Sequence, residues 1–306
     1  MNNPSERIIL TGLSTESRNP LTENLDEMSS FEIVTLMNNE DKKVAESISL
    51  HLKEISQAID YAHSSLERGG RIFYMGAGTS GRLGVCDAAE CPPTFSASPN
   101  QFIGLIAGGP SAFLKAVEGA EDSLNLGKED LIKYNLNNND TVIGLAASGR
   151  TPYVIGGLKY AKDIGCKTIS ISCNLNSEIG KISDVKIEVI VGPEILTGST
   201  RLKAGSAQKM ILNMISTGAM IKYGKVFGNL MVDLMQNNNK LKVRAENIVI
   251  EATGVNREKA REVIDKAKGS VKIAIVMILA NVSYEEALKR LENGKGFVRK
   301  ALSDKI

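Results

Sequence analysis

Short apolar segments alternate with longer amphipathic segments through the middle of the chain. Small or polar residues follow each apolar segment, and these segments cover residues 71–75, 101–107, 141–147, 166–172 and 185–191. The stretches between them, such as 111–126 and 152–165, have the pattern of amphipathic helices. Strands that alternate with helices form a parallel sheet covered on both faces. The sequence therefore predicts an α/β fold with three layers (αβα) around a mostly parallel, five-stranded sheet.

The N-terminal part of the chain has a different pattern. Residues 1–28 are mostly polar and contain turn-forming Pro, Asn and Asp, so we expect an extended arm there. Residues 29–70 have helical periodicity. We expect two helices in this segment, divided near residues 38–41 and ended by Gly69-Gly70.

The C-terminal part is helical throughout. Residues 203–225 carry Met, Ile and Ala on nearly every face, which indicates either a buried helix or a helix at a subunit interface. Four short helix-like pieces follow from about residue 240, with Ser270 and Ser283 as N-caps and Gly254 and Gly269 as stops. We therefore expect three parts. The first is an N-terminal arm with helices (1–58), the second is a central α/β domain (59–236), and the third is a small C-terminal helical domain (237–306).

The composition indicates an ordinary globular protein. The 306 residues are 42% hydrophobic and 24% charged, and the formal net charge is only +2. The basic residues are scattered, so we expect no nucleic-acid partner and no binding to a membrane surface. The longest apolar run, 273–280, is too short to span a bilayer, and no signal peptide is visible. We therefore expect a cytoplasmic protein.

The residues that commonly bind metals are few and poorly spaced. None of the four cysteines forms a C-x-x-C pair, and the two histidines are His51 and His63. This spacing does not fit a zinc site, so we expect no metal and reduced, mostly buried thiols.

A glycine-rich loop follows the first predicted strand. Gly76, Gly78 and Gly81 fit the pattern G-x-G-x-x-G, which raises the possibility of a dinucleotide site. That fingerprint expects an acidic residue about 20 positions further on, but no carboxylate occurs between residues 92 and 118. The loop instead carries the hydroxyls of Thr79 and Ser80. We therefore interpret it as a site for a single sugar phosphate.

Hydroxyl side chains also follow two later strands. Ser148, Gly149 and Thr151 lie where the third strand gives way to a helix. Together with the first loop they could bind one phosphate from two sides, although Ser and Thr at such positions often only cap helices. The segment 192–209 contains Ser199 and Thr200 and could close over a ligand, or it could be a solvated start of a helix.

Two groups of carboxylates stand near these loops. Glu90 precedes Pro92-Pro93, and we expect these prolines to force the chain out of the helix and to fix the direction of Glu90. Glu118, Glu121 and Asp122 are expected on one face of the next helix, where an ordinary solvated surface is the alternative interpretation.

Several blocks of the sequence together resemble one enzyme family. The chain resembles the N-acetylmuramic acid 6-phosphate etherases, bacterial enzymes of peptidoglycan recycling with the sugar isomerase (SIS) fold. The blocks ECPPTF (90–95) and TGSTRLKAG (197–205) are the most specific, and GAEDS (119–123) and AASGRTPY (146–153) support them. The resemblance covers nearly the whole chain and implies a SIS-type fold, a homodimer and no cofactor.

The resemblance also implies a reaction and a set of site residues. These enzymes cleave the D-lactyl ether of N-acetylmuramic acid 6-phosphate by elimination and hydration, which gives N-acetylglucosamine 6-phosphate and D-lactate. Glu90 matches the proton donor of the family and Glu121 the second catalytic acid/base. The phosphosugar would be bound by Gly78, Thr79, Ser80, Ser148, Gly149, Thr151, Ser199 and Thr200. The alternatives are a non-catalytic sugar-phosphate sensor of the same superfamily and a phosphosugar isomerase.

Overall fold

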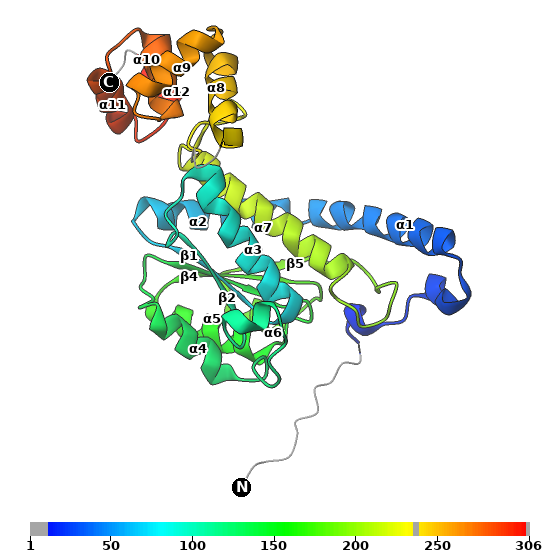
Figure 1. Ribbon diagram of the computed structural model, residues 1–306. Helices are drawn as coiled ribbons and strands as arrows, with labels where there is room; N and C mark the ends of the chain where they lie inside the picture. Colours follow the sequence, from blue (N-terminus) through cyan, green and yellow to red (C-terminus); the bar gives the residue numbers. More distant parts are fainter. Residues whose placement is uncertain (1–11, 235–238, 304–306) are drawn as a thin grey trace.

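A parallel sheet forms the centre of the protein. The computed structural model describes residues 12–234 and 239–303. Its five-stranded sheet has the order β2-β1-β3-β4-β5, and every pair of neighbouring strands is parallel (Figure 1). The strands are β1 (Ile72–Gly76), β2 (Phe102–Ile106), β3 (Thr141–Leu145), β4 (Lys167–Ser172) and β5 (Val185–Glu188). The predicted α/β fold with five mostly parallel strands is confirmed.

Helices cover both faces of this sheet (Figure 1). Along β1, Ile72 and Tyr74 belong to one apolar cluster while Phe73 and Met75 belong to another, because successive strand residues point to opposite faces. One cluster is completed by α1 (Ser30–Ser49), α2 (Leu52–Glu67), α3 (Gly78–Phe95) and α7 (Lys203–Lys222). The other includes residues of α4 (Leu124–Lys133), α5 (Pro152–Ile164) and α6 (Glu178–Ile182).

The N-terminal helices divide later than the sequence pattern predicts. Three short 3-10 helices, η1 (Ser14–Glu16), η2 (Pro20–Thr22) and η3 (Leu25–Glu27), precede α1. Helix α1 then continues through residues 38–41 and ends at Ser49, so the predicted division is wrong. The polar segment stays helical because Glu40 points inward, where it is 3% exposed and pairs with Lys203.

Two further local predictions near the sheet are wrong. Helix α3 does not stop at the prolines but continues through Pro92 and Pro93 to Phe95, because the buried side chains of Cys91 and Phe95 hold its last turn against the core. The chain leaves α3 at Ser96, whose φ is 47°. In the segment 111–126, the 3-10 helix η4 (Pro110–Phe113) is followed by a loop, and α4 begins only at Leu124. Glu118, Glu121 and Asp122 therefore lie in a loop rather than on a helix face.

The C-terminal part forms a helical unit with its own apolar cluster. The hairpin of β6 (Val226–Phe227) and β7 (Leu230–Met231) packs with this cluster, whereas the expected boundary between residues 236 and 237 lies outside the described residues. Ser270 and Ser283 cap their helices as predicted, and one helix, α12, was not predicted. The helices are α8 (Asn239–Thr253), α9 (Arg257–Lys266), α10 (Val271–Ala280), α11 (Tyr284–Asn293) and α12 (Val298–Leu302). Among the described helices, none combines the length and the apolar character needed to cross a bilayer.

Candidate active site

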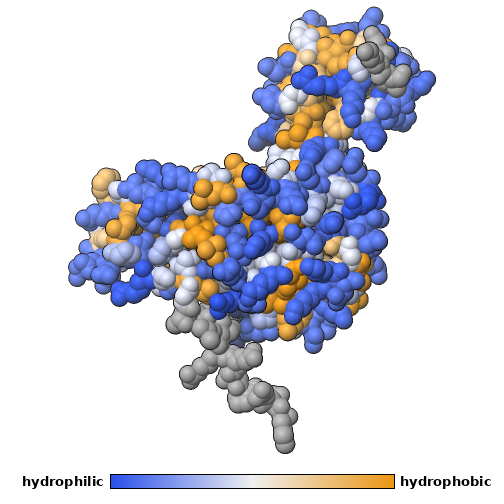
Figure 2. Space-filling view, turned by 180° about the vertical axis from the view of Figure 1, so that it is seen from behind, coloured by the Kyte–Doolittle hydropathy of each residue, from blue (hydrophilic) through white to orange (hydrophobic). Residues whose placement is uncertain are grey.

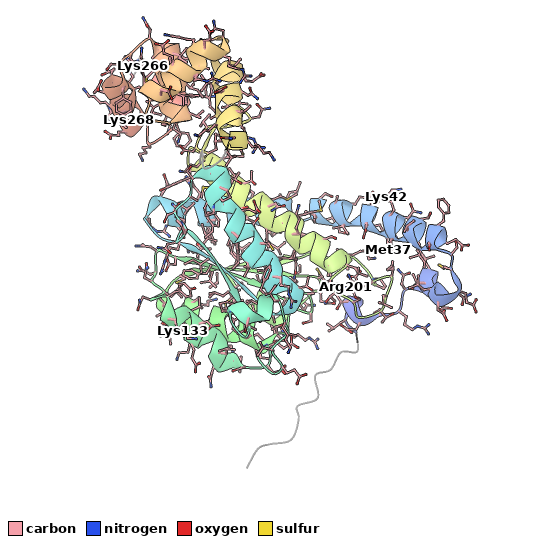
Figure 3. The ribbon with its side chains drawn as sticks, in the orientation of Figure 1. Met37, Lys42, Lys133, Arg201, Lys266 and Lys268 are labelled. Atoms are coloured by element: carbon pink, nitrogen blue, oxygen red, sulfur yellow. The ribbon has the colours of Figure 1, made fainter. Side chains whose placement is uncertain are left out.

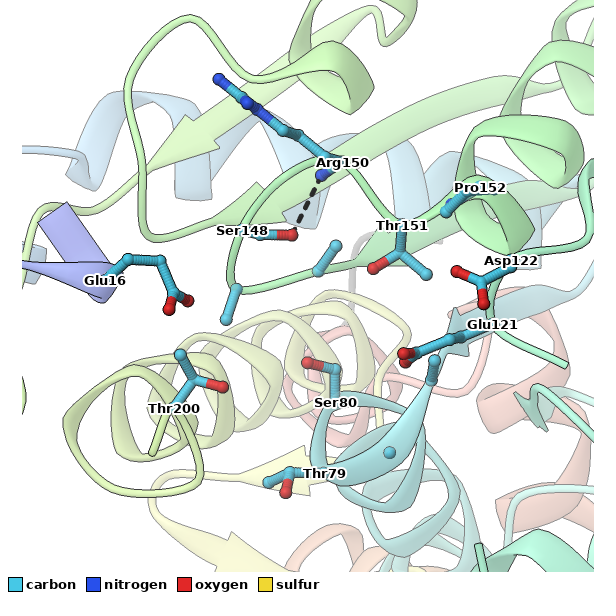
Figure 4. Close-up of a pocket in the computed structure, with 14 residues that line it drawn as sticks. Glu16, Thr79, Ser80, Glu121, Asp122, Ser148, Arg150, Thr151, Pro152 and Thr200 are labelled. Atoms are coloured by element: carbon cyan, nitrogen blue, oxygen red, sulfur yellow. Dashed lines mark hydrogen bonds between the residues drawn. The ribbon is translucent and has the colours of Figure 1, made fainter. Parts of the chain in front are cut away.

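A cavity of about 310 Å³ lies beyond the carboxyl ends of β1 and β3 (Figure 4). This is the edge of a parallel α/β sheet where ligands usually bind. Residues from the N-terminal arm, from three loops that follow strands and from the loop before α7 surround the cavity. They are Glu16, Ala77, Gly78, Thr79, Ser80, Glu121, Asp122, Ala146, Ala147, Ser148, Arg150, Thr151, Pro152 and Thr200.

The first wall of the cavity is the turn between β1 and α3. Gly78 has a φ of 53°, which favours glycine, and it begins the helix. A Cβ at Gly81 would lie 2.5 Å from the Gly76 carbonyl oxygen, so this glycine permits the close packing of helix and strand. Thr79 and Ser80 then lie in the first turn of α3 and line the cavity.

The opposite wall is the turn between β3 and α5. Ser148 and Thr151 line the cavity there, and Pro152 is the first residue of the helix. Gly149 has a φ of 74° and lies close to Ser177, where a Cβ would be only 2.3 Å from the Cβ of that serine. Gly149 therefore shapes the turn and does not itself line the cavity.

Neither helix uses a hydroxyl side chain of these turns as a cap. The N-cap of α3 is Ala77, and the N-cap of α5 is Thr151, whose side chain makes no capping hydrogen bond. The first backbone N–H groups of a helix have no partner within the helix. The N-termini of α3 and α5 thus meet at one cavity, and their positive dipole ends suit it to binding an anion such as phosphate. In α5 the N–H groups of Tyr153 and Val154 already donate to carbonyl oxygens, so the free N–H groups are those of the first turn of α3.

The loop before α4 brings Glu121 to the same cavity. The Tyr153 backbone N–H donates a hydrogen bond of 2.9 Å to the Glu121 carbonyl oxygen, so the first turn of α5 holds this loop. The Glu121 side chain is exposed and points toward Ser80 across the cavity (Figure 4). It also borders an adjoining cavity of about 300 Å³.

Glu90 lies outside the cavity formed by one chain. It is exposed on α3, twelve residues after Gly78, which corresponds to about 18 Å along the helix axis. A single chain therefore brings Glu121, but not Glu90, to the hydroxyl-lined turns.

The segment before α7 contributes one of its two predicted residues. Thr200 lines the cavity and Ser199 does not. Arg201, labelled in Figure 3, is exposed, and it is not among the residues that line the cavity. Glu194 fixes the segment, because its buried carboxylate accepts hydrogen bonds from the backbone N–H groups of Lys203 and Ala204.

Arg150, which lines the cavity, and two further polar residues near it were not identified in the sequence analysis. Glu16 comes from the N-terminal arm, and no pattern in the sequence shows that this arm returns to the sheet. Gln208 lies on α7, where its buried Oε1 accepts a hydrogen bond from Ser80 Oγ at 2.8 Å. A polar residue within the otherwise apolar segment 203–225 was the available signal for Gln208.

The groups that could bind metals are dispersed. Within residues 12–234 and 239–303, no three His, Cys, Asp or Glu side chains form a cluster able to hold an ion. Cys91, Cys166 and Cys173 are buried free thiols, and burial raises the pKa of Cys173 to about 12.

Comparison with known proteins first defines the class. A family model described as the SIS domain matches residues 126–218, and one described as the glucokinase regulatory protein N-terminal SIS domain matches residues 54–162. A phosphoheptose isomerase from Francisella tularensis has the same fold, with a TM-score of 0.52 and 16% identity over 63% of this chain and 100% of its own. Together with the sheet topology, these matches define an SIS-fold protein.

Curated relatives then define the family. N-acetylmuramic acid 6-phosphate etherase from Exiguobacterium sp. is 58% identical over 96% of this chain and 100% of its own length. The protein of the same name from Clostridium beijerinckii is 54% identical over 98% of each chain. The chain belongs to the N-acetylmuramic acid 6-phosphate etherase family.

Proposed function

We propose that this protein is a carbon–oxygen lyase that cleaves the D-lactyl ether of N-acetylmuramic acid 6-phosphate. The products are N-acetylglucosamine 6-phosphate and D-lactate. The observation that carries the proposal is the near-full-length identity of 58% to an etherase, combined with a cavity that offers both phosphate donors and a carboxylate. We also propose a cytoplasmic location, because sugar phosphates are intracellular metabolites.

The phosphate binds between the N-termini of α3 and α5. The donors are the hydroxyls of Ser80, Ser148 and Thr151 and the free N–H groups in the first turn of α3, while α5 contributes the positive end of its dipole. This mode of binding suits a phosphate monoester at one end of a ligand. Anchoring the phosphate fixes the sugar carbons relative to Glu121, and such positioning can lower a barrier by several kcal/mol, on the order of 7–11 at best.

The reaction requires two proton transfers by side chains. In the open-chain sugar the C1 aldehyde acidifies the C2 proton, and a base removes it. The C2–C3 double bond forms while the C3–O bond breaks, and an acid protonates the departing lactate oxygen. The hydroxyl of a water molecule then adds to C3, and a proton returns to C2. Glu121 and Glu90 are the carboxyl groups that we propose for these transfers, in the roles that the family pattern implies.

Glu90 acts on the cavity of a second copy of the chain. This proposal follows from its place about 18 Å along α3 from the cavity of its own chain. An apolar groove between α2 and α7 supports a homodimer, since Leu52, Ile59, Met214 and Ile221 line it next to the helix that carries Glu90. Figure 2 shows apolar residues at the surface of the part of the molecule that contains the sheet. Pairing of two copies would cover such a surface and could also shield the exposed Glu121.

The two alternatives have less support. A phosphosugar sensor would need the anion-binding turns but not the pair of glutamates, and the curated relatives named above are etherases. An isomerase that opens the ring with a histidine would need one near the sugar. His51 and His63 lie at the start of α2 and within it, and neither lines the cavity.

Release of D-lactate from N-acetylmuramic acid 6-phosphate tests the proposed function. The wild-type protein should release one D-lactate for each sugar consumed, and Glu121→Gln should lose at least about a hundredfold in kcat, as expected for a missing acid/base group. Glu129→Gln on the exposed side of α4 is the matched control and should retain wild-type activity. Absence of D-lactate with the wild-type protein would refute the etherase assignment.

A further inference from the structure

Glu16 places a carboxylate in the cavity that the proposed reaction does not yet use. It comes from η1, far along the chain from the other lining residues, and lies on the side of the cavity opposite to Glu121 (Figure 4). Its nearest labelled neighbours in that view are Ser148 and Thr200.

The arm that carries Glu16 is anchored to the core by polar contacts. Asn174, which is 3% exposed, accepts a hydrogen bond from the Ser14 backbone N–H at 2.8 Å. Its amide group donates to Thr15 Oγ1 and to the Ala147 carbonyl oxygen, at 3.0 Å each. Ala147 immediately precedes Ser148 of the phosphate turn. One buried side chain therefore fixes the arm and the cavity wall relative to each other.

The Glu16 carboxylate is available to a ligand. No side chain or backbone group within the described ranges forms a hydrogen bond or an ion pair with its oxygens, although the residues on both sides of it are well anchored. Glu16 is partly exposed and borders the cavity, so it remains an unused acceptor next to the anion-binding turns.

The charge of Glu16 limits what can lie beside it. An ionised carboxylate accepts hydrogen bonds and repels other anions. The proposed substrate carries two anionic groups, the 6-phosphate and the lactyl carboxylate, and between them a neutral part with hydroxyls and an acetamido N–H. Only the neutral part can donate a hydrogen bond to Glu16.

We propose that Glu16 is a specificity-determining residue of this site. Its carboxylate accepts a hydrogen bond from a hydroxyl or the acetamido N–H of the sugar, and it disfavours phosphate on the part of the cavity wall that Thr200 lines. Phosphate is thereby confined to the helix N-termini, and the sugar has one orientation relative to Glu121. The inference rests on the proposed function for the identity of the sugar, whereas its test requires no turnover.

Calorimetric titrations of the full chain test this role with two probes, inorganic phosphate and N-acetylglucosamine 6-phosphate. For Glu16→Gln we expect the Kd of the phosphosugar to rise about tenfold or more, as for loss of a hydrogen bond to a charged group. The Kd of inorganic phosphate should stay the same or fall, because a nearby negative charge is removed. Glu27→Gln, on the exposed surface of η3 in the same arm, should change neither value.

The pattern across the two probes separates a direct role from a structural one. Equal weakening of both ligands would mean that Glu16 only holds the arm in place, and an unchanged Kd for the phosphosugar would mean that it does not meet the sugar; either result overturns the inference. Glu16→Asp is a second variant that keeps the charge. Its Kd for inorganic phosphate should therefore stay at the wild-type value. A wild-type protein that binds the phosphosugar but releases no D-lactate would refute the proposed reaction and leave the Glu16 result standing.

Discussion

Ser80 Oγ donates a hydrogen bond of 2.8 Å to Gln208 Oε1, and both side chains are buried. The contact joins the first turn of α3 to α7 and sets the direction of a hydroxyl that lines the cavity. The Gln208 Nε2 group has no hydrogen-bond partner among the described residues. If the amide turns over, Nε2 donates to Ser80 Oγ, and the Ser80 proton becomes available to a phosphate oxygen.

Gln208→Leu should therefore weaken substrate binding. Removing the partner of Ser80 leaves its hydroxyl without a fixed direction, and a hydrogen bond of this kind contributes about 0.5–1.5 kcal/mol, so KM should rise by roughly two- to tenfold. Steady-state kinetics measure this change. Gln57→Leu on the exposed face of α2 is the control. An effect on kcat with an unchanged KM would show that Gln208 does not act through phosphate binding.

The buried ion pair between Lys203 and Glu40 should be important for stability. The two charged groups are 2.6 Å apart, and their side chains are 1% and 4% exposed. Glu40→Gln would leave the Lys203 ammonium buried without its partner, which costs about 3–5 kcal/mol in the free energy of unfolding. Chemical denaturation measures that loss. The double variant Glu40→Leu/Lys203→Met removes both charges and should lose less; a larger loss would contradict this explanation.

The same pair predicts a dependence of stability on pH. Burial tends to raise the pKa of Glu40, but hydrogen bonds from Lys203 and Lys43 and the charges of these lysines lower it overall. Because the pKa is lower in the folded state, the stabilisation is complete above the pKa of an unfolded glutamate and is lost as the pH falls through the folded value. The free energy of unfolding of Glu40→Gln should thus fall less steeply in acid than that of the wild type. If the free energy of unfolding fell equally steeply with decreasing pH in the wild type and in Glu40→Gln, the effect could not be due to Glu40.

Close packing of α4 against α5 holds the loop that carries Glu121. A Cβ at Gly156 would lie 1.9 Å from the Leu124 carbonyl oxygen, so Gly156→Ala must push the two helices apart. We expect a loss of about 1–3 kcal/mol in stability. Displacement of Glu121 should also lower kcat/KM, on the order of tenfold to a hundredfold.

Thermal unfolding and kinetics measure these two effects together. Lys159→Ala, on the exposed face of α5, is the control and should change neither stability nor activity substantially. A stable and fully active Gly156→Ala protein would show that this packing does not position Glu121.

A site shared between two copies should show complementation. Glu90→Gln and Glu121→Gln should each be nearly inactive alone. A mixed dimer of the two variants contains one cavity with both glutamates, so random pairing during co-expression should restore about a quarter of wild-type activity. If both glutamates served the cavity of their own chain, mixing would restore nothing.

The loops of the site could be predicted from the sequence because strand positions are local information. Five short apolar segments define the sheet, and residues directly after parallel strands must gather at one edge. Ser80, Ser148 and Thr151, which follow the first and third strands, do line one cavity. Local rules also predicted that Pro92 and Pro93 end the helix. This prediction was wrong, because the buried packing of Cys91 and Phe95 keeps α3 helical beyond them.

The remaining features depend on contacts between distant parts of the chain. Glu40 looks like a surface residue in the sequence, and only the structure shows the buried Lys203 that it meets. Glu16 reaches the cavity because Asn174 binds its arm, a contact 160 residues apart along the chain. The hydrophobic periodicity of the sequence contains no information on such contacts between distant residues. The distance of Glu90 from the cavity, by contrast, follows from the twelve helical residues that lead from Gly78 to Glu90, which lie before Pro92.

Reaction of the wild-type protein with N-acetylmuramic acid 6-phosphate in D₂O tests the central claim most directly, with mass spectrometry and NMR of the products. Elimination followed by addition of water predicts D-lactate and N-acetylglucosamine 6-phosphate that carries deuterium at C2. Failure to release D-lactate, or release with an unlabelled C2, would contradict the proposed reaction.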